Sequence, residues 1–189
     1  MKKIICLILL LGSTYIFSNP KKEPRFSTAL TAGYVFKNES NFKNVYGPGV
    51  ANAITADLCY YFYHKWGLGT KVSYWLNHGK TTLLKQRTDL QEVPLTFYIR
   101  RAHDFDCGLR IYLSLGGGVI WLKEKSYLGS EKLTKGIGEV EIGLNYTIWR
   151  FIGITGAFRY LFPSQSQHHH GKKVEVGGLD LRAGIGFSF

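Results

Sequence analysis

The stretch "LDLRAGIGFSF", residues 179–189, decides the fold, because large apolar residues alternate with small or charged ones along its whole length. Side chains of a β-strand point to opposite faces in turn, so residues two apart share a face. One face of this strand would carry Leu179, Leu181, Ala183, Ile185, Phe187 and Phe189. The other would carry Asp180 and Arg182 among glycines and a serine. The rest of the chain has to show which face is buried.

Seven further segments alternate in the same way, and each is about as long as the 9–11 residues of a tilted strand that crosses a membrane. They are residues 25–36, 52–62, 66–77, 90–100, 108–121, 135–146 and 151–162. Long connections are expected at residues 37–51, 78–89, 123–134 and 163–173, and short ones near 63–65, 102–106 and 147–150. Long outer loops that alternate with short periplasmic turns are typical of a membrane barrel with both termini in the periplasm.

The start of the chain predicts export. Lys2 and Lys3 precede a short apolar run, residues 4–11, and small or polar residues follow it up to Ser18. This pattern predicts a signal peptide over residues 1–18, a short periplasmic segment over 19–25 and one barrel domain over 26–189. A retained anchor helix is the alternative, but the apolar run is too short to span a bilayer. Export also argues against nucleic acid as the partner of a chain with a formal charge of +11.

Export, 15% aromatic residues and 22 glycines leave two classes, a secreted soluble β protein and an outer-membrane barrel. The charges within the predicted strands separate them, because all fall on the face that is rich in small residues. They are Asp57, Lys71, Glu92, Arg100, Arg110, Glu139, Glu141, Arg159, Asp180 and Arg182. The opposite face carries aromatic residues near the strand ends, as in the girdles of membrane barrels. We therefore predict an all-β, eight-stranded antiparallel transmembrane β-barrel of up-and-down topology, with these charges paired inside because an unpaired buried charge is costly.

At this point the chain resembles the small eight-stranded outer-membrane proteins: the OmpA-type transmembrane domain, OmpX and the opacity proteins. The C-terminal stretch carries the resemblance, and "EVPLTFYIR", residues 92–100, is similar to a strand common in that group. The resemblance implies a bacterial outer-membrane location with periplasmic termini and extracellular loops. It also implies that the outer-membrane assembly machinery reads a C-terminal signal. Here that signal would be Leu181, Ala183, Ile185, Phe187 and Phe189.

Eight strands leave a narrow interior that side chains can fill, so we expect a plugged barrel with a structural or adhesin-like surface role. A small channel for solutes or hydrophobic molecules is the alternative. A lipid A-modifying enzyme is a third. Its nearest candidates are Ser164, Ser166 and His168–His170 in "PSQSQHHHGKK", residues 163–173. They lie in a predicted loop, in the reverse of the His-x-Ser order of deacylases, so we expect no enzyme, no catalytic residues and no cofactor.

The predicted outer connections are basic. The bases that we single out are Lys80, Lys85, Arg87, Lys172 and Lys173. Anionic surfaces are the expected partners, either lipopolysaccharide in the membrane or sulfated and sialylated host polysaccharides. The consecutive histidines point in different directions, so we expect a solvated loop tip there and no metal site, with weak zinc binding as the alternative. Cys59 and Cys107 fall three predicted strands apart, which argues against a disulfide between them.

Overall fold

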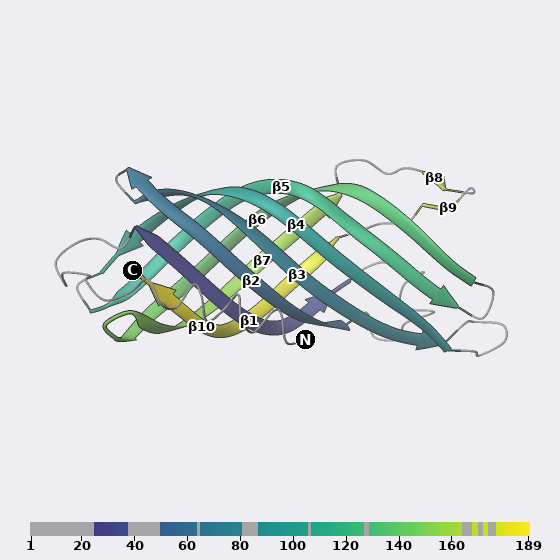
Figure 1. Ribbon diagram of the computed structural model, residues 1–189, viewed down its shortest axis with the longest axis horizontal. Coiled ribbons are helices and arrows are strands. Elements are labelled where there is room, and N and C mark those ends of the chain that lie inside the picture. Colours follow the sequence, from purple (N-terminus) through teal and green to yellow (C-terminus); the bar gives the residue numbers. More distant parts are fainter. Residues whose placement is uncertain are drawn as a thin grey trace, which may run out of the picture.

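The computed structural model describes residues 25–37, 50–63, 65–80, 87–105, 107–126, 129–163, 168–169, 172–173 and 177–189. Eight long strands form one closed antiparallel barrel in the order β1-β10-β7-β6-β5-β4-β3-β2, so each pairs with its neighbours along the chain and β1 closes on β10. Figure 1 shows the strands tilted across the barrel axis. No helix among the described residues is long and apolar enough to cross a membrane.

Every predicted strand is present. The long strands are β1 (Phe26–Phe36), β2 (Val50–Tyr63), β3 (Trp66–Lys80), β4 (Arg87–Asp104), β5 (Leu109–Ser126), β6 (Gly129–Trp149), β7 (Ile152–Pro163) and β10 (Gly178–Ser188). Two short strands, β8 (His168–His169) and β9 (Lys172–Lys173), pair only with each other. The fold class predicted from the alternation is therefore confirmed.

The predicted extents of two connections are wrong. Strands β3 and β4 continue until Lys80 pairs with Arg87, and β5 and β6 continue until Ser126 pairs with Gly129. The sequence prediction ended these strands where their outward residues turn polar, but ladder hydrogen bonds need no apolar face. The last pair of β2 with β3 is Asn52 with Leu76, and β7 ends opposite Ile137.

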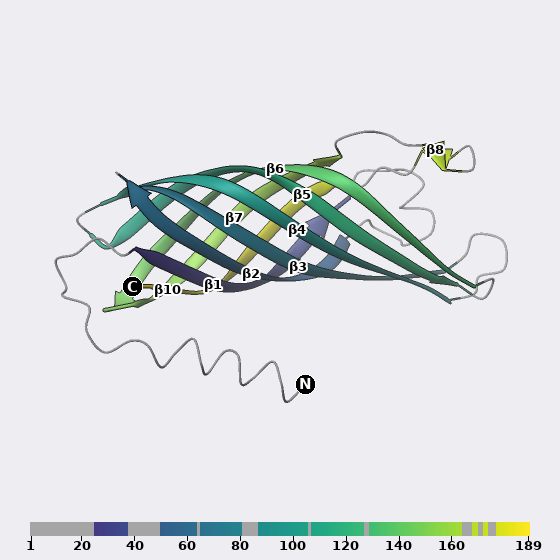
Figure 2. The same ribbon diagram turned by 45° about the horizontal axis from the view of Figure 1, so that its top comes forward.

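Strands β3–β6 thus project beyond the rest of the barrel, as Figures 1 and 2 show on the right. We call this projecting part the ribbon: residues 77–80, 87–90, 120–126 and 129–136. The barrel end that carries it is the ribbon end. The opposite end, where the strands are joined by short turns, is the turn end.

Burial alternates along the strands. Leu30, Ile54 and Phe97 are 56%, 57% and 64% exposed on the outer surface, whereas their inward neighbours Thr31, Thr55 and Thr96 are buried. The outside of the barrel is apolar and its inside is polar, which inverts the arrangement of a soluble barrel. Pro94 lies at the one break in the β3–β4 ladder, between the Val72–Leu95 and Trp75–Glu92 pairs, because proline has no N–H to donate.

The interior has two layers. Nearer the ribbon end lies an apolar cluster in which Trp75 is fully buried. Its members are Val35, Ala51, Ala53, Trp75, Ile120, Leu122, Ile137 and Leu161. Nearer the turn end lie the charged side chains. The sequence prediction of a polar interior missed this apolar layer, because its members are scattered over six strands.

Candidate functional site

The charged layer is one connected network. Eight of the ten predicted inward charges take part, four acids and four bases, and the side chains are 8% exposed or less. The members are Asp57, Glu139, Glu141, Asp180, Lys71, Arg100, Arg159 and Arg182. Their formal charges cancel, so each ionised group can stay buried beside an opposite charge.

Glu141 is the centre of the network. It accepts hydrogen bonds from Lys71 at 2.7 Å, from Arg100 at 3.3 Å and from Arg182. Lys71 Nζ also donates to Glu139 at 3.0 Å. Lys71 belongs to β3 and both glutamates to β6, so these bonds cross the lumen between strands that are not neighbours in the sheet.

Arg159 ties the network to the other side of the barrel. Its Nη2 lies 2.6 Å from Asp180 Oδ2 and 2.8 Å from Ser73 Oγ, and its Nη1 lies 3.5 Å from Glu139. Arg182 Nη1 donates to the same Asp180 oxygen at 3.0 Å. Side chains from β3, β6, β7 and β10 are thereby joined across the lumen.

Aromatic rings sandwich one arginine of the network. The Arg100 guanidinium lies 4.6 Å from the ring centre of Tyr98 and 3.9 Å from that of Tyr112, within the range of cation–π attraction. The Tyr98 hydroxyl also donates to Asp57. Tyr112 covers Gly143, where an added Cβ would come within 2.3 Å of the ring. Tyr112 can therefore reach into the lumen only because that strand position has no side chain.

The other two predicted charges pair outside the network. Arg110 donates to Asp104 near the turn end, and Lys37 donates to Glu92 near the ribbon end. Lys37 had been predicted in the first outer loop, but it is 5% exposed and lies 5.5 Å from the Trp75 ring. Lys37 follows the strand as predicted, but its side chain points inward, because the inward alternation of β1 continues from Val35 to Lys37, one residue past the strand end.

Two sets of described side chains cross the lumen at different levels. The ion network occupies the half nearer the turn end, and the Trp75 cluster with the Lys37–Glu92 pair occupies the half nearer the ribbon end. A small polar recess lies at the turn end, lined in part by Tyr61, Arg110 and Asn145. We find no group of three or more metal-binding side chains among the described residues. Cys59 is buried, Cys107 is exposed, and both are free thiols.

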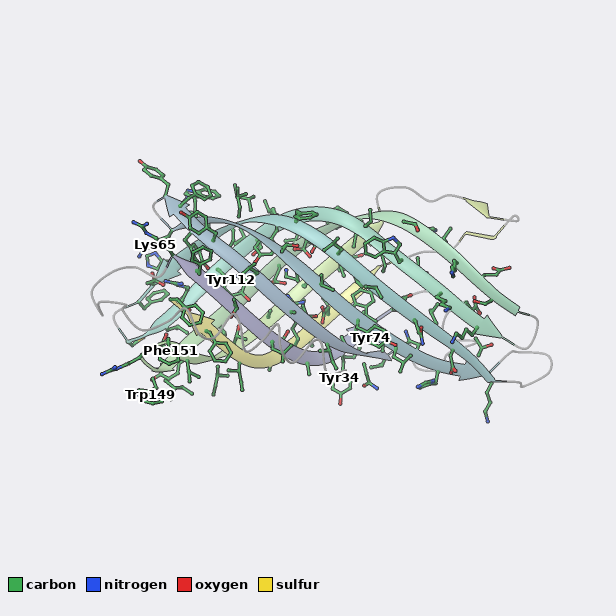
Figure 3. The ribbon with its side chains drawn as sticks, viewed as in Figure 1. Tyr34, Lys65, Tyr74, Tyr112, Trp149 and Phe151 are labelled. Carbon is green, nitrogen blue, oxygen red and sulfur yellow. The ribbon has the colours of Figure 1, made fainter. Side chains whose placement is uncertain are left out.

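The predicted assembly residues lie on the outer surface of the last strand. Leu181, Ala183 and Ile185 are exposed there, and the rings of Phe187 and Phe189 stack with centres 6.4 Å apart. Phe151 stacks on Phe189 at 6.2 Å. Figure 3 shows Trp149 and Phe151 at this end and Tyr34 and Tyr74 nearer the other, as in two aromatic girdles.

The predicted basic loop residues are distributed differently from the expectation. Lys80 and Arg87 are paired strand residues of the ribbon, not loop residues. Lys172 and Lys173 lie in β9, opposite His169 and His168. Lys85, Ser164, Ser166, His170 and the predicted signal peptide lie outside the described residues.

The outward face of the ribbon, which continues the lipid-facing side of the barrel wall, is basic. The sequence alone does not show this, because these residues become neighbours only through the strand register. Lys123 and Lys132 lie directly opposite each other, and Lys80 lies opposite Arg87. Lys125 is opposite Asp89, which is itself hydrogen-bonded to His78 at 2.7 Å. Among the outward positions whose side chains the structure describes, Lys80, Lys123, Lys125 and Lys132 are basic and only Asp89 is acidic.

The fold defines a class, the small eight-stranded transmembrane β-barrels. No protein-family model matches the sequence, and no curated protein sequence does. Among solved structures, the chain is similar to Neisserial surface protein A (NspA), with a TM-score of 0.67 and 12% identity over 89% of this chain and 100% of that one. OprG from Pseudomonas aeruginosa gives a TM-score of 0.62 and 12% identity over 91% and 99% of the two chains.

A third similar structure is Ail of Yersinia pestis in complex with the heparin analogue sucrose octasulfate. Its TM-score is 0.54, with 16% identity over 87% of this chain and 99% of that one. NspA is described as a surface protein and OprG as an outer membrane protein, and the predicted resemblance to small outer-membrane barrels is confirmed at the level of the fold.

Proposed function

We propose that this protein is an integral outer-membrane barrel that acts through its extracellular end and has neither enzymatic activity nor an open pore. The turn end lies in the periplasm, and the ribbon end lies outside the cell. The side chains that cross the lumen are the observation that carries the proposal. Glu141 bonds bases from other strands across the lumen, and the ring of Trp75 is buried in it nearer the ribbon end, so the described residues place side chains in the way of a solute at two levels.

The basic ribbon supports a surface-interaction role. Four lysines stand against one acid at its described outward positions, and such a face attracts polyanions. Ail, a barrel of the same fold, was solved with a sulfated heparin analogue. The partner class that fits this chain is therefore a sulfated or phosphorylated polysaccharide, held by Lys80 and Lys125 at the ribbon tip. The assembly machinery is a further partner, through the C-terminal aromatic residues of β10.

Two measurements test this function. We expect the refolded protein to give no stable current steps in a planar bilayer; reproducible steps would favour the small channel. We also expect binding to immobilised heparin that weakens with salt, and a K80A/K125A variant that elutes at lower salt than the wild type. A matched K65A/R101A variant changes bases at the turn end and should elute unchanged. Equal elution of the ribbon variant and the wild type would remove the ribbon from the proposal.

A further inference from the structure

Two lysines at the base of the ribbon repel each other in the absence of a ligand. Lys123 of β5 and Lys132 of β6 are directly opposite in the register, on the outward face. Cβ atoms of such pairs are about 5 Å apart, and like charges in this position destabilise a sheet. Neither lysine forms an ion pair with another described residue. Gln91, the other cross-strand neighbour of Lys123, is neutral.

The surface next to this pair is apolar. Toward the turn end, the following outward rows are Trp121 with Thr134, Val119 with Gly136, and Gly117 with Gly138. None of them carries a charge, and Trp121 is 45% exposed. An indole beside the apolar surface of a membrane barrel marks the boundary between hydrocarbon and headgroups. Lys123 lies two residues beyond Trp121 on the same face, so the lysine pair lies at the level of the headgroups.

The spacing agrees with this placement. Six residues separate Gly117 from Lys123, which is about 20 Å along a strand at about 3.4 Å per residue. A strand tilted by about 45° converts this to about 14 Å along the membrane normal. Half of a hydrocarbon core of about 30 Å is about 15 Å. The row at Gly117 therefore lies near the bilayer centre when the lysine pair is at the outer surface.

We propose that Lys123 and Lys132 hold a phosphate group of lipopolysaccharide, with its acyl chains along the Trp121 and Val119 surface below. A phosphate between the two ammonium groups removes their repulsion and accepts hydrogen bonds from both. This inference rests on the proposed function, because the ribbon end must face outward, where lipopolysaccharide forms the leaflet. It concerns the ribbon base, whereas the polysaccharide site is at the tip.

The neighbouring rows fit a phosphate less well. In the next row outward, Asp89 stands opposite Lys125 and also bonds His78, so an acid of the protein already lies beside that base. The Lys80–Arg87 row is further still from Trp121. Among the described outward positions of the ribbon, the Lys123–Lys132 row alone combines an uncompensated pair of bases with adjoining apolar surface.

The experiment compares lipids on the full barrel, refolded in detergent and analysed by native mass spectrometry. Lipid A with its phosphates, lipid A without phosphates, and the anionic phospholipid cardiolipin are added in turn. We expect phosphorylated lipid A to bind, and a K123A/K132A variant to bind it about thirtyfold more weakly, from the contribution of two bases at an anionic lipid surface. A K80A/K125A variant should keep the wild-type affinity. Resistance of folded protein to unfolding in unheated gel samples serves as the folding control for both variants.

Each other outcome overturns the proposal. Equal lipid A affinity of K123A/K132A and wild type would remove the lysine pair as the site. Equal binding of dephosphorylated lipid A would exclude the phosphate contact, and equal or tighter binding of cardiolipin would assign the site to phospholipid. The heparin test remains separate: loss of heparin binding in the tip variant with no effect of K123A/K132A on lipid A would support the proposed function and refute this inference.

Discussion

Replacing Glu141 by glutamine tests the ion network directly. Glutamine keeps the size and one acceptor oxygen of glutamate, but the network then has one uncompensated positive charge. Glu141 is completely buried and bonds three bases: Lys71, Arg100 and Arg182. Loss of one partner from a buried ion pair costs about 3–5 kcal/mol. Because the amide oxygen still accepts a hydrogen bond, we expect the lower end, about 3 kcal/mol.

The assay is urea unfolding of the barrel in detergent micelles, followed by tryptophan fluorescence. With a urea slope of about 2 kcal/mol per molar, this change lowers the midpoint by about 1.5 M. The matched control is E131Q, the same substitution on the same strand, at an exposed position of the ribbon. Its effect should stay within about 0.5 kcal/mol, as for other surface substitutions.

A double variant separates charge from packing. Lys71→Met in the E141Q background restores the neutrality of the network. The double variant should therefore lose less free energy of unfolding than the sum of the two single variants, by about 1 kcal/mol or more. Equal urea midpoints for E141Q and E131Q would refute the reasoning. The buried charge of Glu141 would then contribute no more to stability than the exposed charge of Glu131.

Three further predictions concern packing, the lipid face and assembly. Gly143→Ala should lower the unfolding midpoint, because its Cβ meets the Tyr112 ring at 2.3 Å, whereas Gly156→Ala, with no atom nearer than 3.9 Å, should leave it nearly unchanged. Phe97→Arg should cost about 2–4 kcal/mol in lipid vesicles, because the side chain points to the middle of the membrane. Phe187→Asp should cost less than that in vesicles but should abolish insertion by the assembly machinery in cells; normal amounts in outer membranes would contradict the assembly signal.

The strands and their faces could be predicted because a barrel imposes the simplest sequence period. Glu141 lies between Val140 and Ile142, and Lys71 lies in an alternating run with Leu68, Val72 and Tyr74 on the opposite face, so the inward direction of both follows from counting residues. The ion-pair partners of these residues cannot be predicted by counting residues. Which base meets Glu141 depends on strand order and stagger around the closed barrel, and Lys71 reaches it across the lumen from a strand seventy residues away in sequence.

Predictions failed where the apolar signal ended before the strand did. Residues 123–134 are mostly polar and show no regular apolar alternation, so we expected a loop where β5 and β6 remain paired. The burial of Lys37 was not foreseen for the related reason that one inward residue follows the last apolar one. The apolar alternation of the sequence follows contact with lipid, whereas the length of a strand follows backbone hydrogen bonding. In this barrel the apolar alternation ends before the paired strands do.

The sequence showed the basic outward face only as a general excess of positive charge, because the strand register, and not the sequence pattern, brings its bases together. Lys123 and Lys132 are nine residues apart and become a pair only through the hairpin register. Inside the barrel every register that buried an unpaired charge would cost several kcal/mol, so the interior charges cancel. On the ribbon, solvent and lipid headgroups can surround an unpaired charge, so the cost of leaving it unpaired is lower there. An uncompensated pair can therefore persist there, and its position beside Trp121 makes a phosphate the counter-charge that the surrounding surface can supply.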